Sequence, residues 1–360
     1  MIGQTRLALG LMSGTSLDGV DAALLWTDGE SAGAAGAAIT IPYPAPLREA
    51  LRGALGGQGP VAEIERAMTL FHAEVAEQLL RQAGRRDVAV VGFHGHTLLH
   101  QPERRRTWQI GDGALLAEIL KLPVVNDFRS DDVAAGGQGA PLLPAFHAAL
   151  AAQDALPLAV LNIGGVANVT WVGHQGQLLA FDTGPGNALL DDWILRRTGA
   201  PFDAEGRIAA SGRAEPAAID RFLAHPFFSR RPPKSLDRDE FAAFAEGLVS
   251  GLGLADGAAT LAEFTVAAIA RGAAWLPAPP LAWLVCGGGR HNRALMVRLG
   301  ERLGAPVEPV ETRGWNGDAL EAQGFAYLAV RSLLGLPLSW PGTTGVTEPL
   351  TGGRLHLPPG

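Results

Sequence analysis

The stretch LGLMSGTSLDGVDAALLW, residues 9–26, decides how the rest of the chain is interpreted. Two apolar runs, typical of β-strands, flank a short polar turn. The turn region carries three hydroxyl side chains and two carboxylates, at Ser13, Thr15, Ser16, Asp18 and Asp21. A hairpin turn needs little more than glycine or asparagine. This composition therefore indicates a turn that also binds something.

The composition is that of a soluble globular protein. The chain has 360 residues, enough for two hydrophobic cores, with 47% apolar and 18% charged residues. Its formal net charge of −7 argues against a nucleic-acid partner. The apolar runs are too short or too interrupted to span a bilayer, and we expect neither a membrane partner nor a signal peptide. A single cysteine, Cys286, excludes an internal disulfide and favours the cytoplasm.

The pattern of the opening stretch returns about 150 residues later. Residues 6–12 and 19–26 predict two strands around the polar turn, and PLAVLNIGGVANVTWV (157–172) again predicts strand, glycine turn and strand. Further strands are predicted at 37–43, at 88–95, at 122–128 and at the starts of 177–187 and 281–292. Helices are predicted at 61–83, 113–120, 257–276, 292–303 and 317–335.

This alternation predicts an α/β protein with internal duplication. We expect a first lobe over residues 1–152, a second over 153–345 and a turn-rich C-terminal tail over 346–360. The tail itself indicates nothing about the fold.

Glycine turns follow or separate the predicted strands at Gly14 to Gly19, at Gly164–Gly165 and at Gly287–Gly289. Glycine lets backbone N–H groups approach an anion, although each turn taken alone is better explained as a structural turn. Two turns in matching places could grip a triphosphate from opposite sides, and the third could let a nucleoside lie close to the backbone. Lys121 and Lys234 are the only lysines. Any phosphate site must therefore rely on backbone N–H groups, arginines or a metal.

Three carboxylates are candidates for chemistry. Asp18 and Asp21 could hold a hydrated Mg²⁺, which takes one or two carboxylates together with waters and substrate phosphates. The alternative for Asp18-Gly19 is a plain turn. Asp182, at a predicted strand end in AFDTGPGN, could act as a general base in phosphoryl transfer. The alternative is an aspartate that bonds only the neighbouring backbone.

His94, His96 and His100 form an H-x-H-x₃-H pattern that raises the question of a zinc site. The carboxylates downstream follow no recognised zinc spacing. A loop that contacts a substrate is the preferred interpretation.

Eight motifs in order resemble the anhydro-N-acetylmuramic acid kinase family, a branch of the sugar kinase, Hsp70 and actin superfamily. The resemblance runs from about residue 7 to about 345. The motifs are GLMSGTSLDGVDAAL, GFHGHT, WQIGDGALLAE, PVVNDFRSDDVAAGGQGAPLLPAFH, LNIGGVANVT, FDTGPGNALLDDW, VCGGGRHNRALM and EAQGFAYLA. The resemblance implies two RNase-H-like lobes, as in actin-like ATPases, around a nucleotide cleft. It also suggests a homodimer.

The resemblance also implies roles for individual residues. Asp182 matches the catalytic base, and the sugar would be bound by His94, His96, Thr97 and Arg129. ATP would be bound by Gly14, Thr15, Ser16, Leu17, Asp18, Gly19, Val20, Asp21, Gly164, Gly165, Asn168, Gly287, Gly288 and Gly289. His96 stands where the family usually has glutamine, and it brings a proton that ordinarily titrates near neutral pH.

The implied substrate is a small anhydro-amino-sugar, 1,6-anhydro-N-acetylmuramic acid, in which O6 is tied to C1. The base would activate a water that attacks C1, while O6 takes the γ-phosphoryl group of ATP with Mg²⁺ present. The products would be ADP and N-acetylmuramic acid 6-phosphate, a step in peptidoglycan recycling.

Three other functions compete with this one. Asp182-Thr-Gly is also the aspartic-protease signature, but a single chain of this length should carry two copies and has one. A dinucleotide site at Gly287–Asn292 lacks the third glycine of its fingerprint, and it leaves both hairpins unexplained. A non-enzymatic chaperone or sugar-sensing regulator would carry an added binding domain, which this chain lacks.

Overall fold

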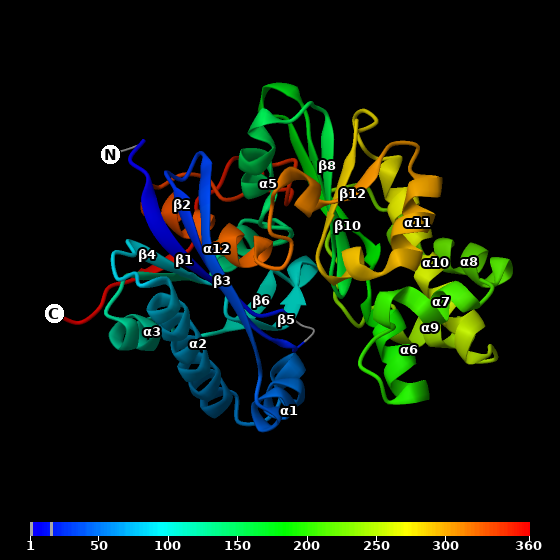
Figure 1. Ribbon diagram of the computed structural model, residues 1–360, viewed down its shortest axis with the longest axis horizontal. Coiled ribbons are helices and arrows are strands. Elements are labelled where there is room, and N and C mark those ends of the chain that lie inside the picture. The colour runs from blue at the N-terminus through cyan, green and yellow to red at the C-terminus, as the bar shows by residue number, and fades with distance from the viewer. Residues whose placement is uncertain (1–2, 15–16) are drawn as a thin grey trace. The chain divides into compact units, whose positions relative to one another are not determined.

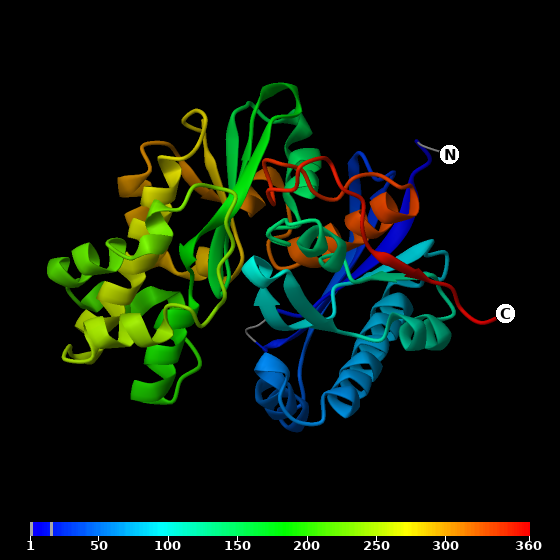
Figure 2. The same cartoon turned by 180° about the vertical axis from the view of Figure 1, so that it is seen from behind.

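The computed structural model describes residues 3–14 and 17–360. The chain forms two compact units. The first combines the residues up to Ala152 with Asp318–Gly360, and the second is Gln153–Gly317. Each unit has its own β-sheet covered by helices (Figures 1 and 2). Within the described residues, every helix is too short or too polar to cross a membrane.

The sheet of the first unit begins with an antiparallel meander and continues with parallel strands. β1 pairs antiparallel with β2 on one side and parallel with β4 on the other. Its order is β13-β7-β4-β1-β2-β3. The strands are β1 (Arg6–Met12), β2 (Gly19–Thr27), β3 (Ala32–Pro42), β4 (Val90–Phe93), β7 (Val124–Asn126) and β13 (Arg354–His356). A separate hairpin joins β5 (His96–Gln101) and β6 (Arg106–Ile110).

Both faces of this sheet are covered, as the uninterrupted apolar sequence of β1 predicts. Leu9 and Leu11 belong to the core that includes Met68 of α2. Gly10 points to the other face, where an added Cβ would lie 1.7 Å from a carbonyl oxygen of α12. The helices are α1 (Ala45–Ala54), α2 (Val61–Ala83), α3 (Gly113–Leu120), α4 (Ser130–Ala134), α5 (Pro144–Leu150) and α12 (Leu320–Leu333).

The sheet of the second unit has the same arrangement, with the order β10-β9-β8-β11-β12. β8 is again the strand between an antiparallel partner, β9, and a parallel partner, β11. The strands are β8 (Leu158–Ile163), β9 (Val166–Val172), β10 (Leu178–Pro185), β11 (Trp283–Cys286) and β12 (Val307–Pro309). The predicted α/β class and internal duplication are therefore confirmed.

The second unit carries a helical region between β10 and β11. Its helices are α6 (Ala188–Thr198), α7 (Arg207–Ser211), α8 (Pro216–Leu223), α9 (Ala242–Val249) and α10 (Leu254–Ala273), and α11 (Arg293–Arg302) follows β11. Aromatic rings fill its core: the rings of Phe222 and Phe264 stack with centroids 4.1 Å apart. Of these helices, the sequence predicts α10 and α11, and it does not predict α6, α7, α8 or α9.

The C-terminal region differs from the expected division of the chain. The sequence predicts a second lobe extending to residue 345, followed by a separate tail. In the structure, α12 and the tail both belong to the first unit. A Cβ on Gly92 would lie 2.0 Å from the carbonyl oxygen of Phe325, so α12 packs directly on β4. β13 of the tail pairs with β7. Helical periodicity identifies α12, but it does not indicate which sheet the helix covers.

Candidate active site

The first polar turn joins β1 to β2. Thr15 and Ser16, predicted ATP contacts, lie outside the described residues. The N–H of Leu17 donates to the carbonyl of Gly14 at 3.1 Å, and Leu17 has a positive φ of 59°. The side chains of Leu17 and Val20 are buried in the core. These two residues can therefore offer a ligand only their backbone.

The two carboxylates of this hairpin lie in different surroundings. The Asp18 side chain is 74% exposed and forms an ion pair of 3.6 Å with Arg48. Asp21 is more buried and accepts a hydrogen bond of 2.6 Å from Thr40 Oγ1. Burial raises the pKa of Asp21, and the charges of Asp318 and Asp18 raise it further, while the Thr40 hydroxyl opposes them. Neighbouring carboxylates that repel one another are chemically suited to a divalent cation.

Gly19 is glycine for a structural reason. A Cβ at this position would lie 2.3 Å from the carbonyl oxygen of Ile41 on β3. Its backbone follows the turn directly, at the start of β2.

The second glycine turn joins β8 to β9 and is held by the loop that follows Asp182. The N–H of Asn187 donates to the Gly164 carbonyl at 2.7 Å, and the N–H of Gly186 donates to the Gly165 carbonyl at 2.9 Å. A Cβ on Gly186 would lie 2.2 Å from the Gly164 oxygen. By contrast, a Cβ on Gly164 or Gly165 would meet nothing closer than 3.7 Å. The turn itself therefore leaves room for a ligand.

The third glycine run follows β11 and packs against the same end of β8. A Cβ on Gly287 would lie 2.3 Å from Asn162 Oδ1, and one on Gly289 would lie 2.4 Å from Ile163 Cγ2. Gly288 is exposed, with no such contact closer than 3.6 Å. Gly287 and Gly289 thus allow close packing against β8, and Gly288 is the position of this run that leaves space beside the backbone.

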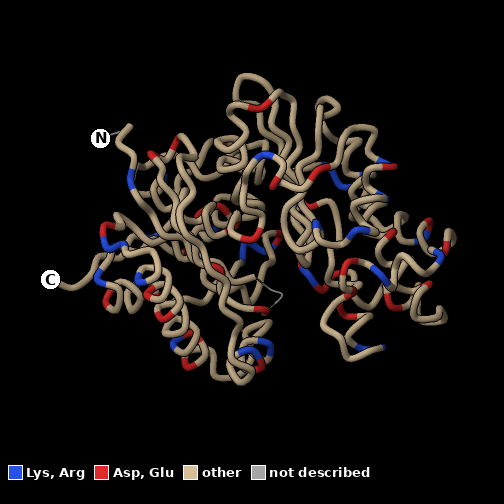
Figure 3. Tube along the Cα trace, viewed as in Figure 1, with Lys and Arg blue, Asp and Glu red and all other residues tan. Residues whose placement is uncertain are grey.

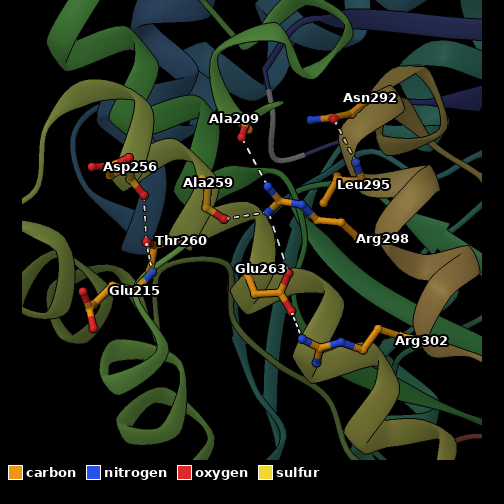
Figure 4. Close-up of polar contacts among 10 residues, drawn as sticks. All are labelled: Ala209, Glu215, Asp256, Ala259, Thr260, Glu263, Asn292, Leu295, Arg298 and Arg302. Carbon is orange, nitrogen blue, oxygen red and sulfur yellow. Dashed lines mark hydrogen bonds and ion pairs between the residues drawn. The ribbon is translucent and has the colours of Figure 1, made fainter. Parts of the chain in front are cut away.

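Helix α11, which follows this run, is fixed to α10 by the polar contacts in Figure 4. Asn292 caps its N-terminus, because its side-chain oxygen accepts a hydrogen bond from the N–H of Leu295. Arg298 donates to the Ala259 carbonyl at 2.8 Å. The buried carboxylate of Glu263 on α10 forms ion pairs with Arg298 and Arg302. The glycine run is therefore held from both sides, by β8 and by α11.

Asp182 lies in β10, opposite Asn168 of β9. Its side chain is buried, with the residue 6% exposed. Its Oδ2 accepts a hydrogen bond of 2.7 Å from the N–H of Leu236, and its own N–H donates to the Lys234 carbonyl at 2.9 Å. The structure thus brings the predicted base, Asn168 and the second glycine turn together within one sheet.

Two basic residues near these elements had no signal in the sequence. Lys234 is one of them, since its carbonyl accepts the Asp182 N–H. Arg238 lies beside the second turn, with its Nε 3.8 Å from where a Cβ of Gly165 would be. Its guanidinium also contacts Asp192 at 3.1 Å and Asp239 at 2.8 Å. Both residues precede α9 in a stretch without regular periodicity, so the sequence offers no way to place them.

Two predicted sugar-binding residues of the first unit contact each other. Arg129 donates to Nε2 of His94 at 3.0 Å, and Nδ1 of His94 donates to the Gly95 carbonyl at 2.9 Å. Burial, together with the Arg129 charge, lowers the pKa of His94 well below its usual value. The pair therefore presents a neutral imidazole beside a cation.

His96 connects this region to the first turn. Its Nδ1 lies 3.3 Å from Ser13 Oγ. Burial lowers the pKa of His96 to about 4, so the expectation of a proton that titrates near neutral pH is wrong. Thr97 accepts a hydrogen bond of 3.4 Å from Gln109. In the part of the chain that the structure describes, no three His, Cys, Asp or Glu side chains are grouped closely enough to hold a metal ion.

Charged residues of both signs are interspersed along the described chain, without a concentrated basic region (Figure 3). The one long helix of the first unit, α2, carries both signs. Electrostatic attraction to a polyanion therefore has no obvious surface among these residues.

The family profile described as anhydro-N-acetylmuramic acid kinase matches residues 6–357. The chain belongs to this family. It is 61% identical to the anhydro-N-acetylmuramic acid kinase of Paramagnetospirillum magneticum, over 98% of this chain and 100% of that one. It is 57% identical to the enzyme of the same name from Rhodospirillum rubrum, over 96% and 93% of the two chains.

The match to the anhydro-N-acetylmuramic acid kinase family includes both glycine hairpins, the Asp182 loop and the tail to residue 357. Among solved structures, component A of (R)-2-hydroxyglutaryl-CoA dehydratase from Acidaminococcus fermentans is similar, with a TM-score of 0.49 and 14% identity. That likeness covers 91% of this chain and 99% of the other. At this identity and TM-score, nothing about the site follows from it.

Proposed function

We propose that Asp182 is the general base of this enzyme and that the two glycine hairpins bind the phosphates of ATP. The activity follows from the family. The chain is an anhydro-N-acetylmuramic acid kinase, an ATP-dependent phosphotransferase of peptidoglycan recycling. The assignment of individual residues to that activity is our proposal.

The substrate sets the chemistry that the residues must perform. In 1,6-anhydro-N-acetylmuramic acid, O6 is bonded to C1, so there is no free 6-hydroxyl to deprotonate. A water attacks C1 and loses a proton to a base, the C1–O6 bond breaks, and O6 forms a bond to the γ-phosphorus of ATP. The bond between the γ-phosphorus and the β,γ-bridging oxygen breaks, and ADP leaves with its electron pair. The products are ADP and N-acetylmuramic acid 6-phosphate.

The position and hydrogen bonding of Asp182 carry this proposal. The carboxylate is buried within β10, beside an irregularity in the pairing with β9, and its orientation is set by the Leu236 N–H at 2.7 Å. A hydrogen bond from a backbone N–H stabilises the charged form, which is the form that accepts a proton.

The phosphate contacts are proposed to come mainly from the backbone. In the first unit they are the N–H groups of Gly14 to Asp21, with the hydroxyls of Thr15 and Ser16. In the second unit they are Gly164 and Gly165, with Asn168 nearby. Oriented N–H groups favour an anion without the need for a lysine. Gly287, Gly288 and Gly289 are proposed to lie beside the nucleoside, with Gly288 closest.

Asp18 and Asp21 would hold Mg²⁺. Two carboxylates fit this ion, which keeps waters and substrate phosphates as its other ligands. When bound, it neutralises negative charge on the phosphates.

The sugar is proposed to lie against His94, His96, Thr97 and Arg129. The His94–Arg129 pair combines a cation with a neutral ring, which suits the carboxylate and hydroxyls of an N-acetylmuramic acid derivative. Arg129 also donates to the Gly139 carbonyl at 2.6 Å. That contact restricts the guanidinium before any sugar binds.

The decisive experiment combines ATP, Mg²⁺ and 1,6-anhydro-N-acetylmuramic acid in isotopically labelled water. The expected product is a 6-phosphosugar with the label in its C1 hydroxyl. Asp182→Asn should lower kcat by about a thousandfold, as expected for loss of a general base. Asp220→Asn is the matched control, because Asp220 is an exposed aspartate of α8 in the same unit. If Asp182→Asn keeps more than a few per cent of the rate, Asp182 is not the base.

We also propose that the enzyme is a cytoplasmic homodimer. The family resemblance supports the dimer, and the single buried cysteine is compatible with a reducing compartment. Sedimentation velocity should give twice the mass of one chain, and a monomeric mass at working concentrations contradicts the proposal.

A further inference from the structure

Lys234 is a buried cation in a chain that has only one other lysine, the exposed Lys121. It is 4% exposed and lies in the second unit, two residues before Leu236. A buried ammonium is unfavourable unless it is paired, so the groups around it indicate its role. An apolar side chain of similar length would fill the same space without that cost.

The partners of the ammonium are few and specific. Nζ donates to the Phe227 carbonyl at 2.9 Å and lies 4.2 Å from the centroid of the Phe227 ring. Three charged groups act on it: Arg230 just before it in the chain, Arg271 on α10 and Asp182 on β10. The two arginines repel it. Asp182 is the carboxylate among these groups, and it is the group that favours the charged ammonium.

The backbone around Lys234 is bonded to the same aspartate. The Lys234 carbonyl accepts the Asp182 N–H at 2.9 Å, and the Leu236 N–H donates to Asp182 Oδ2 at 2.7 Å. One three-residue segment thus fixes the backbone of Asp182, orients its carboxylate and supplies a nearby positive charge.

We infer that Lys234 is a positioning residue for the catalytic base: its positive charge favours ionised Asp182, and the backbone of residues 234–236 orients the carboxylate. The inference rests on the proposed role of Asp182. It assigns Lys234 no contact with ATP or the sugar.

A dependence on pH follows from the same contacts. Burial lowers the pKa of Lys234 to about 8, and Arg230 and Arg271 lower it as well, while Asp182 raises it. Below this pH Lys234 carries the positive charge that favours the ionised form of a nearby carboxyl group, and above it that charge is lost.

The coupling between the two groups can be measured without any catalysis. Protein labelled with ¹³C-lysine should give two Cε signals, and Lys121→Met identifies the one that belongs to Lys234. We expect the Lys234 signal to titrate near pH 8. In Asp182→Asn its midpoint should fall by about half a unit or more, because an attractive charge has been removed. An unchanged midpoint overturns the inference.

Kinetics then test what the charge does. Lys234→Met should move the acid limb of the kcat profile up by about one unit, so that kcat falls by up to about tenfold at pH values below that limb. KM for ATP and for the sugar should change little. Lys234→Arg should restore the position of the acid limb, and Lys121→Met, the matched control, should leave the profile as it is.

The outcomes separate this inference from the proposed function. If Asp182→Asn stays active, Asp182 is not the base and the proposed function fails. If Asp182→Asn is inactive but folded Lys234→Met keeps the wild-type kcat and acid limb, only the role of Lys234 fails. Thermal melting establishes whether Lys234→Met is folded, and the lysine titration in Asp182→Asn tests the coupling even if it is not.

Discussion

The two glycine hairpins occupy the same place in two sheets of the same topology, yet they are built from different chemistry. The first is polar, with Ser13, Asp18 and Asp21 in and around the turn. The second has only Gly164 and Gly165 at its turn, and its loop contacts hold it in place. The two units thus share a backbone arrangement, while acidic groups lie on one hairpin and the proposed general base lies beside the other.

The difference shows how one supersecondary unit can serve two roles. The first turn is followed by the carboxylates proposed for Mg²⁺. The charged groups near the second turn come from other segments of the same unit. Arg238 lies beside Gly165, and Asp182 lies on β10, which pairs with β9. If this division is right, substitutions at the two hairpins should fail in different ways.

The largest effect is expected where the second turn is clamped. In Gly186→Ala, the new Cβ would lie 2.2 Å from the Gly164 carbonyl oxygen, which is rigid backbone. Overpacking of this kind destabilises by about 1–3 kcal/mol. If the loop that follows Asp182 is displaced, the proposed base is misplaced, which can lower kcat by about a hundredfold. Thermal unfolding and kcat measure the two effects.

Gly165→Ala is the matched variant for that test. Its Cβ would meet nothing closer than 3.8 Å, so the melting temperature should stay near wild type. KM for ATP should rise, because the methyl group occupies the space proposed for phosphate. A wild-type melting temperature and kcat in Gly186→Ala contradict the clamp.

Substitutions in the first hairpin should act by weakening the binding of Mg²⁺. Asp21→Asn is expected to raise the Mg²⁺ concentration for half-maximal activity by about tenfold or more, as loss of a metal-binding group commonly does. Asp18→Asn should raise it less, because the Asp18 side chain is 74% exposed and already faces Arg48. Titration of activity with Mg²⁺ measures both. Equal, unchanged values in the two variants remove these residues from the metal site.

The sequence predicted this hairpin pair because its signal is local. Two apolar runs with a turn between them determine β1 and β2 at Arg6–Met12 and Gly19–Thr27, and the same holds for β8 and β9. Helix α2 begins and ends where the periodicity and Gly84 indicate, at Val61–Ala83. The role of Asp182 stays a prediction, and its expected place at a strand end differs from the structure, because β10 continues to Pro185.

What the sequence did not predict depends on contacts between distant segments. Nothing local shows that α12 covers the first sheet, which follows from the fit of its backbone against Gly10 and Gly92. Likewise, Lys234 and Arg238 lie in an irregular stretch and become notable only when it reaches Asp182 and Gly165. The burial of His96, which keeps its ring neutral, is a tertiary property as well.

A smaller effect is expected from Arg238→Met, which sharpens the comparison from the side of the second hairpin. The buried Nε of Arg238 has no hydrogen-bond partner among the described residues and lies beside Gly165. If it helps to hold phosphate, its removal should raise KM for ATP about tenfold, the value of one charge-assisted hydrogen bond. Arg196→Met is the control, because Arg196 forms an exposed ion pair with Glu246 in the same unit. If KM for ATP is unaltered, Arg238 does not bind phosphate, and its ion pairs with Asp192 and Asp239 are its role.

The smallest catalytic effect is expected at His96, beside the first hairpin. Because burial holds the pKa of His96 near 4, its ring is neutral in the working range, and glutamine can hydrogen-bond in a similar way. His96→Gln should therefore change kcat/KM for the sugar by less than about threefold between pH 6 and 8.

Stability should reveal this substitution where activity does not. A histidine whose pKa is lowered by folding binds fewer protons in the native state than in the unfolded state at pH values between about 4 and 6.5. The free energy of unfolding therefore falls with acidification over that range, by about 1.4 kcal/mol per pH unit for each such histidine. His96→Gln removes one of these contributions, so the variant should resist unfolding at pH 5 better than wild type relative to pH 7. An identical acid dependence of the unfolding free energy in the two proteins would mean that His96 is charged or exposed in the native state. The contact between His96 and Ser13 would then have to be abandoned.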